Sequence, residues 1–360
     1  MRVMSVVGAR PQFVKLAPID AAFREAGIDH VIVHTGQHYD PMLSDVFFSD
    51  LGISAPDVHL GVGSGSHGVQ TGTMLAAMDE TIETYRPDWV LVYGDTNSTL
   101  AGALSAVKLH VPIAHLEAGL RSFNRAMPEE INRILTDHAA DLLLAPTEVG
   151  AAHLADEGLA DRTVVVGDVM TDILFSVRDS VVDTPSPVMT ELDLPEGEYS
   201  LATIHRAENT DDPERLRSIL ESLAAVDHPV VLLAHPRLVA KCAEHGIALG
   251  DSGNLRMHPP LAYPELIAST LHARGVVTDS GGLQKEAFLL RAPCTTVRPQ
   301  TEWVETVNLG WNVLVEPGQA LVRAASRPRP TEPAEAEAHP YGDGNAAHRV
   351  VQALTDHLPG

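Results

Sequence analysis

Short apolar runs alternate along the chain with longer segments whose apolar residues recur every three or four positions. In the first half, apolar runs lie at residues 3–7, 30–34, 89–93, 113–115 and 142–145. Runs of this kind predict strands that are buried on both faces, as in a parallel sheet covered by helices. Helical patterns fill the intervening residues 18–26, 66–85, 99–109 and 128–140. The alternation predicts right-handed βαβ units and an α/β fold.

The same alternation returns in the second half. Apolar runs at residues 164–166, 199–204, 230–234, 255–258, 275–278 and 295–297 predict the strands of a second parallel sheet, with a polar, proline-bearing spacer at 181–198. We therefore predict an N-terminal Rossmann-like domain over residues 1–170 and a C-terminal one over 171–345. Residues 346–360 carry an amphipathic helix that we expect to pack back on the junction. In such sheets ligands bind at the carboxyl ends of strands, so two facing domains predict a central cleft.

Charge and cysteine content narrow the range of partners. The formal net charge is −23 at pH 7, and a strongly acidic surface repels nucleic acid and anionic lipid. We expect neither as a partner. Cys242 and Cys294 are far apart and form no CxxC pair, which indicates a reducing cytoplasm. No apolar run reaches the length that crosses a membrane.

Basic side chains follow the first predicted strand. Gly8 permits close backbone approach, and Arg10 and Lys15 flank the start of the next helix. A helix N-terminus with two cations suits a phosphate or diphosphate, although a surface turn with two basic residues would look the same. The stretch matches neither GxGxxG nor a Walker A loop, so we predict neither NAD nor ATP.

Asp95 lies where the strand at 89–93 gives way to a helix. It could be the N-cap of that helix, but Thr96 or Asn97 could cap equally well, which leaves Asp95 for another role. Glu117 and Glu129 follow the next strand. Carboxylates that converge from adjacent strand ends raise one another's pKa, as general acid–base catalysis needs.

Two alternatives remain open for this acidic cluster. Glu129 could instead interact favourably with the helix dipole, or it could form an i,i+4 ion pair with Arg133. A metal site is the other alternative, but His115 and Glu117 two residues apart are weak evidence, and no HExxH motif or cysteine cluster supports it. We predict no metal.

The second half offers an anion site of its own. His205 lies at the carboxyl end of a strand and could act as an acid or as a phosphate donor. Ser280, Gly281 and Gly282 lie between a strand and a helix, where backbone N–H groups can form an anion nest. Glu286 follows one turn later, and its carboxylate could accept two ribose hydroxyls. The simpler alternative is a plain capped helix.

Eight segments together resemble the non-hydrolysing UDP-N-acetylglucosamine 2-epimerase family. In the family's order and within residues 8–310, they are GARPQFVKLAPI, TGQHYD, YGDTNSTLAGA, HLEAGLRS, PEEINR, TIHRAEN, DSGGLQKEA and TEWVETV. The resemblance implies a glycosyltransferase-B architecture with UDP between two Rossmann-like domains, a cytoplasmic homodimer and no redox cofactor. It also implies a reaction: UDP is eliminated across C1 and C2 to give 2-acetamidoglucal and adds back with C2 inverted, which yields UDP-N-acetylmannosamine.

The resemblance also assigns residues. It implies phosphate binding by Arg10, His205, Ser280, Gly281 and Gly282, ribose binding by Glu286, and catalysis by Lys15, Asp95, Glu117, Glu129 and His205. Which carboxylate is the acid and which the base stays open. Three arginines are further candidates for sugar binding: Arg121, Arg133 and Arg298.

One departure from the family bears on regulation and substrate. Many bacterial members carry Gln-His-Arg where UDP-N-acetylglucosamine binds as an activator, whereas this chain reads GQHYDPM there and GSGSHGVQ later, without the arginine. We therefore expect either no activation requirement or a modified sugar. Relatives with the TEWVE stretch use 2,3-diacetamido sugar acids, for which Arg298 is a candidate partner of the C6 carboxylate.

Three other functions remain as alternatives to a non-hydrolysing epimerase. They are a glycosyltransferase of the same architecture, a hydrolysing epimerase and a non-catalytic nucleotide-sugar sensor.

Overall fold

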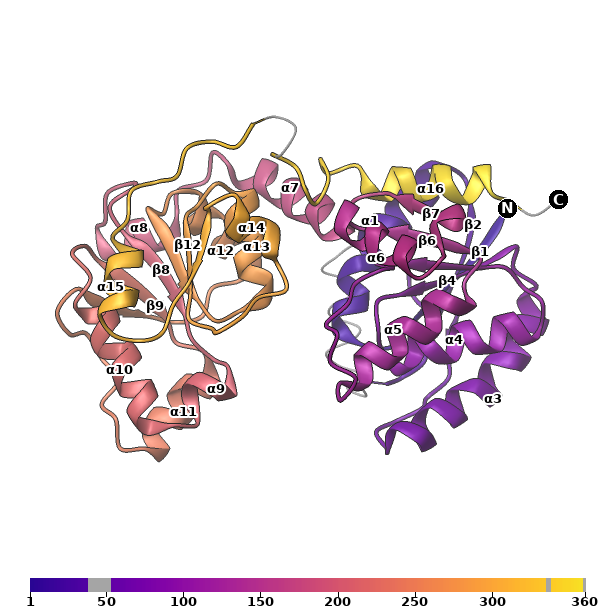
Figure 1. Ribbon diagram of the computed structural model, residues 1–360, viewed down its shortest axis with the longest axis horizontal. Coiled ribbons are helices and arrows are strands. Elements are labelled where there is room, and N and C mark those ends of the chain that lie inside the picture. The colour runs from indigo at the N-terminus through magenta and orange to yellow at the C-terminus, as the bar shows by residue number, and fades with distance from the viewer. Residues whose placement is uncertain (38–52, 335–337, 359–360) are drawn as a thin grey trace. The chain divides into compact units, whose positions relative to one another are not determined.

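The computed structural model describes residues 1–37, 53–334 and 338–358 (Figure 1). The chain forms two compact units, one made of residues 1–173 and 340–360 and the other of residues 174–339. Each unit contains one wholly parallel sheet with apolar side chains packed on both faces. The predicted α/β class with two Rossmann-like sheets is confirmed.

The sheet of the first unit has seven strands in the order β3-β2-β1-β4-β5-β6-β7. Their bounds are β1 Arg2–Val7, β2 Asp29–His34, β3 Val58–His59, β4 Trp89–Tyr93, β5 Ile113–Leu116, β6 Leu142–Ala145 and β7 Thr163–Val165. The strand order reverses direction between β1 and β4, and ligands of such sheets bind at the strand carboxyl ends beside this reversal. Lys15 and Asp95 follow β1 and β4, which border it, and Glu117 follows β5, the next strand beside β4.

Side chains satisfy the first N–H groups of several helices of this unit, among them α4 and α6. Their bounds are α1 Arg10–Glu25, α3 His67–Tyr85, α4 Asn97–Lys108, α5 Pro128–Ala139, α6 Glu148–Asp156 and α16 Ala346–Asp356, with α7 Val169–Val181 spanning the division between the units. The sequence predicts the first helix only from residue 18, but Gln12 Oε1 accepts the N–H groups of Gly8 and Ala9, so α1 starts eight residues earlier.

The C-terminal helix α16 belongs to the first unit. Val350 and Leu354 join a core with Val3 and Phe13, and α16 packs on α1 (Figure 1). Asp172 accepts the N–H groups that open α16, at 3.0 and 2.7 Å. The chain thus returns to its first unit after completing the second.

The second unit has six strands in the order β10-β9-β8-β11-β12-β13. Their bounds are β8 Ser200–Thr203, β9 Val230–Leu233, β10 Leu255–His258, β11 Gly275–Thr278, β12 Cys294–Thr296 and β13 Asn312–Leu314. The helices are α8 Pro187–Leu192, α9 Ala207–Thr210, α10 Pro213–Ala224, α11 Pro236–Glu244, α12 Tyr263–Leu271, α13 Gly281–Leu289, α14 Val304–Asn308 and α15 Gln319–Ala325.

Two predictions about the elements are wrong. The run at 164–166 is predicted in the second sheet, but β7 pairs in parallel with β6 and completes the first sheet. An apolar run indicates a strand, not its neighbour, because sheet membership depends on long-range pairing. The spacer at 181–198 contains the short helix α8, which Ser186 caps and which buries Val188.

Candidate functional site

An ion pair lies at the carboxyl ends of the strands of the first unit. Lys15 Nζ on α1 contacts the carboxylate of Glu117, which directly follows β5. The pair rests against Gly94, where an added Cβ would lie 3.2 Å from Glu117 Oε2 and 3.4 Å from Lys15 Nζ. Gly94 has φ 63° and Glu117 has φ 73°. A glutamate backbone in this left-handed region is strained by on the order of 1–3 kcal/mol. The surrounding fold therefore has to hold Glu117 in this conformation.

Lys15 is held as a cation. Burial alone lowers its pKa, but the Glu117 carboxylate outweighs this, and Asp168 and Asp95 add smaller contributions, so the pKa of Lys15 lies above its ordinary value. An ammonium group in this state suits a fixed positive charge beside the carboxylates rather than a general base.

Asp95 is not the cap of the helix that follows it. Thr96 caps α4 by accepting the N–H of Thr99, so the N-cap alternative for Asp95 is wrong. The Asp95 side chain is 30% exposed, and its Oδ2 lies 2.5 Å from Arg133 Nη2. The structure thus brings Asp95 and Glu117 to the same cation-bearing strand ends, where both contribute to the pKa of Lys15.

Glu129 does not join this cluster through any contact in the described part of the chain. It is exposed in the first turn of α5. The alternative that it pairs with Arg133 is wrong, because Arg133 pairs with Glu130 at 3.0 Å instead. Its predicted catalytic role therefore stays a prediction.

The Arg121 side chain is buried and pairs with two carboxylates of the protein. It is 1% exposed, contacts Asp137 at 2.7 Å and binds Glu157 through two nitrogens. Asp137 also lies 2.6 Å from His115 Nδ1, and the other nitrogen of that ring lies 2.7 Å from the Gly94 carbonyl. The prediction that Arg121 binds sugar is corrected here, since its donors are already bonded inside the protein.

In the second unit a buried aspartate joins two strand ends. Asp279, fully buried after β11, accepts the backbone N–H groups of His205 and Arg206 at 3.0 and 2.9 Å and the side-chain amide of Asn209 at 3.0 Å. His205 Nδ1 lies 3.2 Å from Asp279 Oδ1. This arrangement places His205 beside Ser280, the N-cap of α13.

The first turn of α13 is the place of the predicted anion nest. Gly281 and Gly282 begin the helix, and the Ser280 hydroxyl accepts the Leu283 N–H. Trp303 Nε1 donates to the Gly281 carbonyl at 2.7 Å, so the TEWVE segment packs on this turn. A helix start with glycines suits an oxyanion, but the Ser280 cap also fits a plain capped helix, so the anion nest stays a prediction.

Glu286 and Arg298 border the same turn. The Tyr263 hydroxyl donates to Glu286 Oε1 at 3.0 Å. Burial raises the pKa of Glu286, although the Tyr263 hydrogen bond and the charge of Lys285 oppose the rise. The guanidinium of Arg298 is buried and lies 3.0 Å from Glu302 Oε2.

Two predicted features involve atoms or residues outside the described part of the chain. The side chain of Arg10 and the residues 38–40 of the GQHYD segment lie outside the described residues. Within the described ranges, no group of three or more histidine, cysteine or acidic side chains is arranged to hold a metal ion, and no helix is long and apolar enough to cross a membrane.

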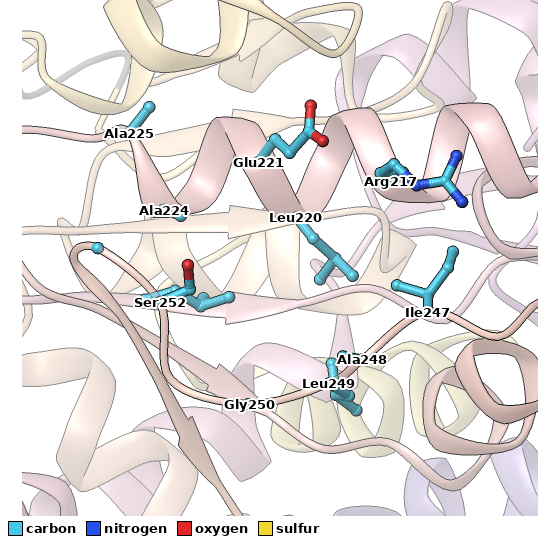
Figure 2. Close-up of a pocket in the computed structure, with 12 residues that line it drawn as sticks. Arg217, Leu220, Glu221, Ala224, Ala225, Ile247, Ala248, Leu249, Gly250 and Ser252 are labelled. Atoms are coloured by element: carbon cyan, nitrogen blue, oxygen red, sulfur yellow. The ribbon is translucent and has the colours of Figure 1, made fainter.

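A pocket of about 400 Å³ in the second unit lies away from these strand ends (Figure 2). Leu220, Ile247 and Leu255 line it, with Arg217 and Glu221 on α10. It opens where β9 and β10 begin, whereas His205 and Ser280 follow the ends of β8 and β11. No predicted site residue lines this pocket.

Comparison with known proteins identifies the family of this chain. The family model described as UDP-N-acetylglucosamine 2-epimerase matches residues 21–355. The chain belongs to this family. It is 46% identical over 363 residues to the UDP-2,3-diacetamido-2,3-dideoxy-D-glucuronate 2-epimerase of Pseudomonas aeruginosa, with 98% of this chain and 99% of that protein covered. It is 43% identical to a UDP-N-acetylglucosamine 2-epimerase homolog of Methanococcus maripaludis, with 98% and 99% covered.

Solved structures of the UDP-N-acetylglucosamine 2-epimerase family have the same fold. The crystal structure of the Methanocaldococcus jannaschii UDP-GlcNAc 2-epimerase in complex with UDP-GlcNAc and UDP aligns with a TM-score of 0.79 at 38% identity, covering 99% of this chain and 100% of that one. The Neisseria meningitidis enzyme bound to UDP-GlcNAc gives 0.81 at 27% identity, with 99% and 100% covered. The predicted family is confirmed.

Three buried acidic residues that hold candidate site residues in place were not predicted from the sequence. Asp279 joins two strand ends, Asp137 holds His115 and Arg121, and Glu130 binds Arg133. A signal existed for Asp279, because it directly precedes the Ser-Gly-Gly turn at a strand end. Glu130 adjoins Glu129, and only the rotation of α5 determines which of the two faces inward.

Proposed function

We propose that this chain is a non-hydrolysing 2-epimerase that interconverts UDP-N-acetylglucosamine and UDP-N-acetylmannosamine. The Lys15–Glu117 pair beside Asp95 is the observation that carries the proposal, since carboxylates held next to a fixed ammonium suit proton transfer. In the forward half-reaction a carboxylate takes the C2 proton while the C1–O bond to UDP breaks, which gives 2-acetamidoglucal and UDP. In the return half-reaction a proton is delivered to the opposite face of C2 and the UDP oxygen re-forms the C1 bond.

The leaving diphosphate needs strong stabilisation. The C2 proton is not acidified by a neighbouring carbonyl, so departure of UDP must drive its loss. The Ser280–Gly282 turn at the start of α13, with His205 beside it, supplies donors suited to a diphosphate. We assign UDP binding to this turn, with Glu286 as the partner of the ribose hydroxyls.

Product analysis tests the proposal. Incubation with UDP-N-acetylglucosamine should give UDP-N-acetylmannosamine in a reversible equilibrium, without free sugar. Release of free N-acetylmannosamine with UDP would favour a hydrolysing epimerase. Sugar transfer that requires an added acceptor would favour a glycosyltransferase, and binding without any conversion would favour a sensor.

A second candidate substrate is UDP-2,3-diacetamido-2,3-dideoxy-glucuronate. The Pseudomonas aeruginosa relative carries that substrate in its name. Arg298, beside the anion turn, is a candidate partner for the sugar C6 carboxylate, provided that the substrate displaces Glu302. A higher kcat/KM for the acidic sugar, lost selectively in Arg298→Met, would establish this candidate.

UDP binding should weaken as the pH falls. Because burial raises the pKa of Glu286, its carboxylate becomes protonated at a pH above the ordinary value of 4.5 and loses its capacity to accept both ribose hydroxyls. A hydrogen bond to a charged group contributes about 1.5–3 kcal/mol, so we expect roughly a 10–100-fold rise in Kd across this titration. Calorimetry across pH measures it. The terminal phosphate of UDP has its own titration at about pH 6. Glu286→Gln is therefore the control, and its UDP affinity should keep only the pH dependence that comes from the phosphate.

Turnover should need no activating ligand. Gln70, at the end of the GSGSHGVQ stretch that lacks the arginine, is buried and bonded within the protein: it donates to the Gly63 carbonyl at 3.1 Å and accepts from Asn97 at 2.8 Å. Initial rates with UDP-N-acetylmannosamine alone should therefore show no lag. If turnover began only after a trace of UDP-N-acetylglucosamine was added, this expectation would be wrong.

A further inference from the structure

Arg133 on α5 joins two carboxylates that differ in exposure. Its Nη2 lies 2.5 Å from Asp95 Oδ2 and its Nη1 lies 3.0 Å from Glu130 Oε2. The Arg133 side chain is 17% exposed, and Glu130 is buried. Both ends of the guanidinium are therefore engaged by the protein itself, which argues against the predicted role of Arg133 as a direct sugar ligand.

Glu130 is a fixed anchor for this arginine. Its Oε2 accepts the backbone N–H and the hydroxyl of Ser122, each at 2.9 Å, and its Oε1 accepts the Phe123 N–H at 2.8 Å. Burial alone raises the pKa of Glu130, but these donors and Arg133 outweigh it and lower the pKa below its ordinary value. Glu130 is therefore an anion at neutral pH whose position is set by the turn at residues 122–123.

The same helix also holds the backbone of Asp95. Asn132 Nδ2, one residue before Arg133, donates to the Asp95 carbonyl at 2.9 Å and reaches Asn97 Oδ1 at 3.3 Å. Helix α5 thus fixes both the main chain and the side chain of Asp95. No described residue forms a hydrogen bond with Oδ1 of Asp95, so that oxygen is available for a reacting proton.

We infer that Arg133 is a positioning residue that orients the Asp95 carboxylate for proton transfer, with Glu130 fixing Arg133 in turn. The inference rests on the proposed function, in which Asp95 faces the sugar. A planar guanidinium that binds one carboxylate oxygen restricts rotation of the group and directs the other oxygen. Lys15 from α1, Glu117 after β5 and Asp168 are further charged groups in this cluster, and neither contact of Arg133 involves them.

Two variants at this position test the inference. Arg133→Gln should lower kcat on the order of 10²-fold, the effect of a misplaced reacting group, while the Kd for UDP stays unchanged. Arg133→Lys keeps a cation in reach of Asp95 and should recover part of that loss.

A matched control is the Arg349–Asp343 pair, whose nitrogens and oxygens lie 2.8 Å apart on the surface of the same unit. Arg349→Gln should leave kcat and the Kd for UDP unchanged. Wild-type kcat in Arg133→Gln, or equal losses in both Arg133 variants with a raised sugar KM, would overturn the inference. If the wild-type protein converts no UDP-sugar, the proposed function fails instead, so the two failures are distinguishable.

Discussion

Replacing Asp95 by asparagine should lower kcat for epimerisation by roughly 10²–10⁴-fold, the usual contribution of general acid–base catalysis. The substitution keeps the shape of the side chain and removes its capacity to carry a proton. Thr96 caps α4, so the helix does not depend on the Asp95 carboxylate, and Asn132 still holds the backbone carbonyl of residue 95. We therefore expect thermal stability and UDP affinity close to those of the wild type.

The rate loss is measured by NMR of the UDP-sugar pool, with UDP affinity measured by calorimetry on the same preparation. Asp156→Asn is the matched control, because Asp156 is an exposed residue at the end of α6. Near-normal epimerisation by Asp95→Asn in a folded protein would remove Asp95 from the proposed mechanism.

Replacing Asp137 by alanine should destabilise the first unit by about 3–5 kcal/mol, the cost of leaving a buried charge unpaired. Asp137 is fully buried and contacts Arg121 at 2.7 Å and His115 at 2.6 Å. Burial alone raises the pKa of Asp137, but the charges and hydrogen bonds of His115 and Arg121 lower it below the ordinary value. A lowered folded-state pKa means that this stabilisation is present above the ordinary carboxyl pKa of 3.8 and is lost as the pH falls below it.

Urea denaturation measures the loss, and hydrogen exchange of peptides from β5 and α5 localises it to the first unit. Asp343→Ala, which breaks the exposed pair with Arg349, should cost only about 0–1 kcal/mol. Equal losses in the two variants would mean that the buried network contributes no more than a surface ion pair.

The sequence predicts most strands and several helices of the first unit, because buried parallel strands and amphipathic helices differ in period. It does not reveal β3, which has two residues, or β13, which has only two apolar residues after Asn312. It also places β7 in the wrong sheet, because strand pairing is a long-range property.

The candidate site is only partly visible in the sequence. Position at a strand end singles out Asp95, Glu117, His205 and Ser280, since carboxyl ends of parallel strands share one edge of a sheet. The contacts of a long side chain are not visible in this way. Arg121 and Arg133 look alike in the sequence, but the first is enclosed by the core and the second reaches Asp95.

In the proposed mechanism, carboxylates of the first unit remove and return the C2 proton of a UDP-sugar. Proton NMR of the wild-type protein incubated with UDP-N-acetylglucosamine in D2O, without any acceptor, follows this proton. We expect loss of the C2 proton signal as deuterium enters both epimers, and far slower exchange in Asp95→Asn. Interconversion of the epimers with the C2 proton fully retained would contradict it.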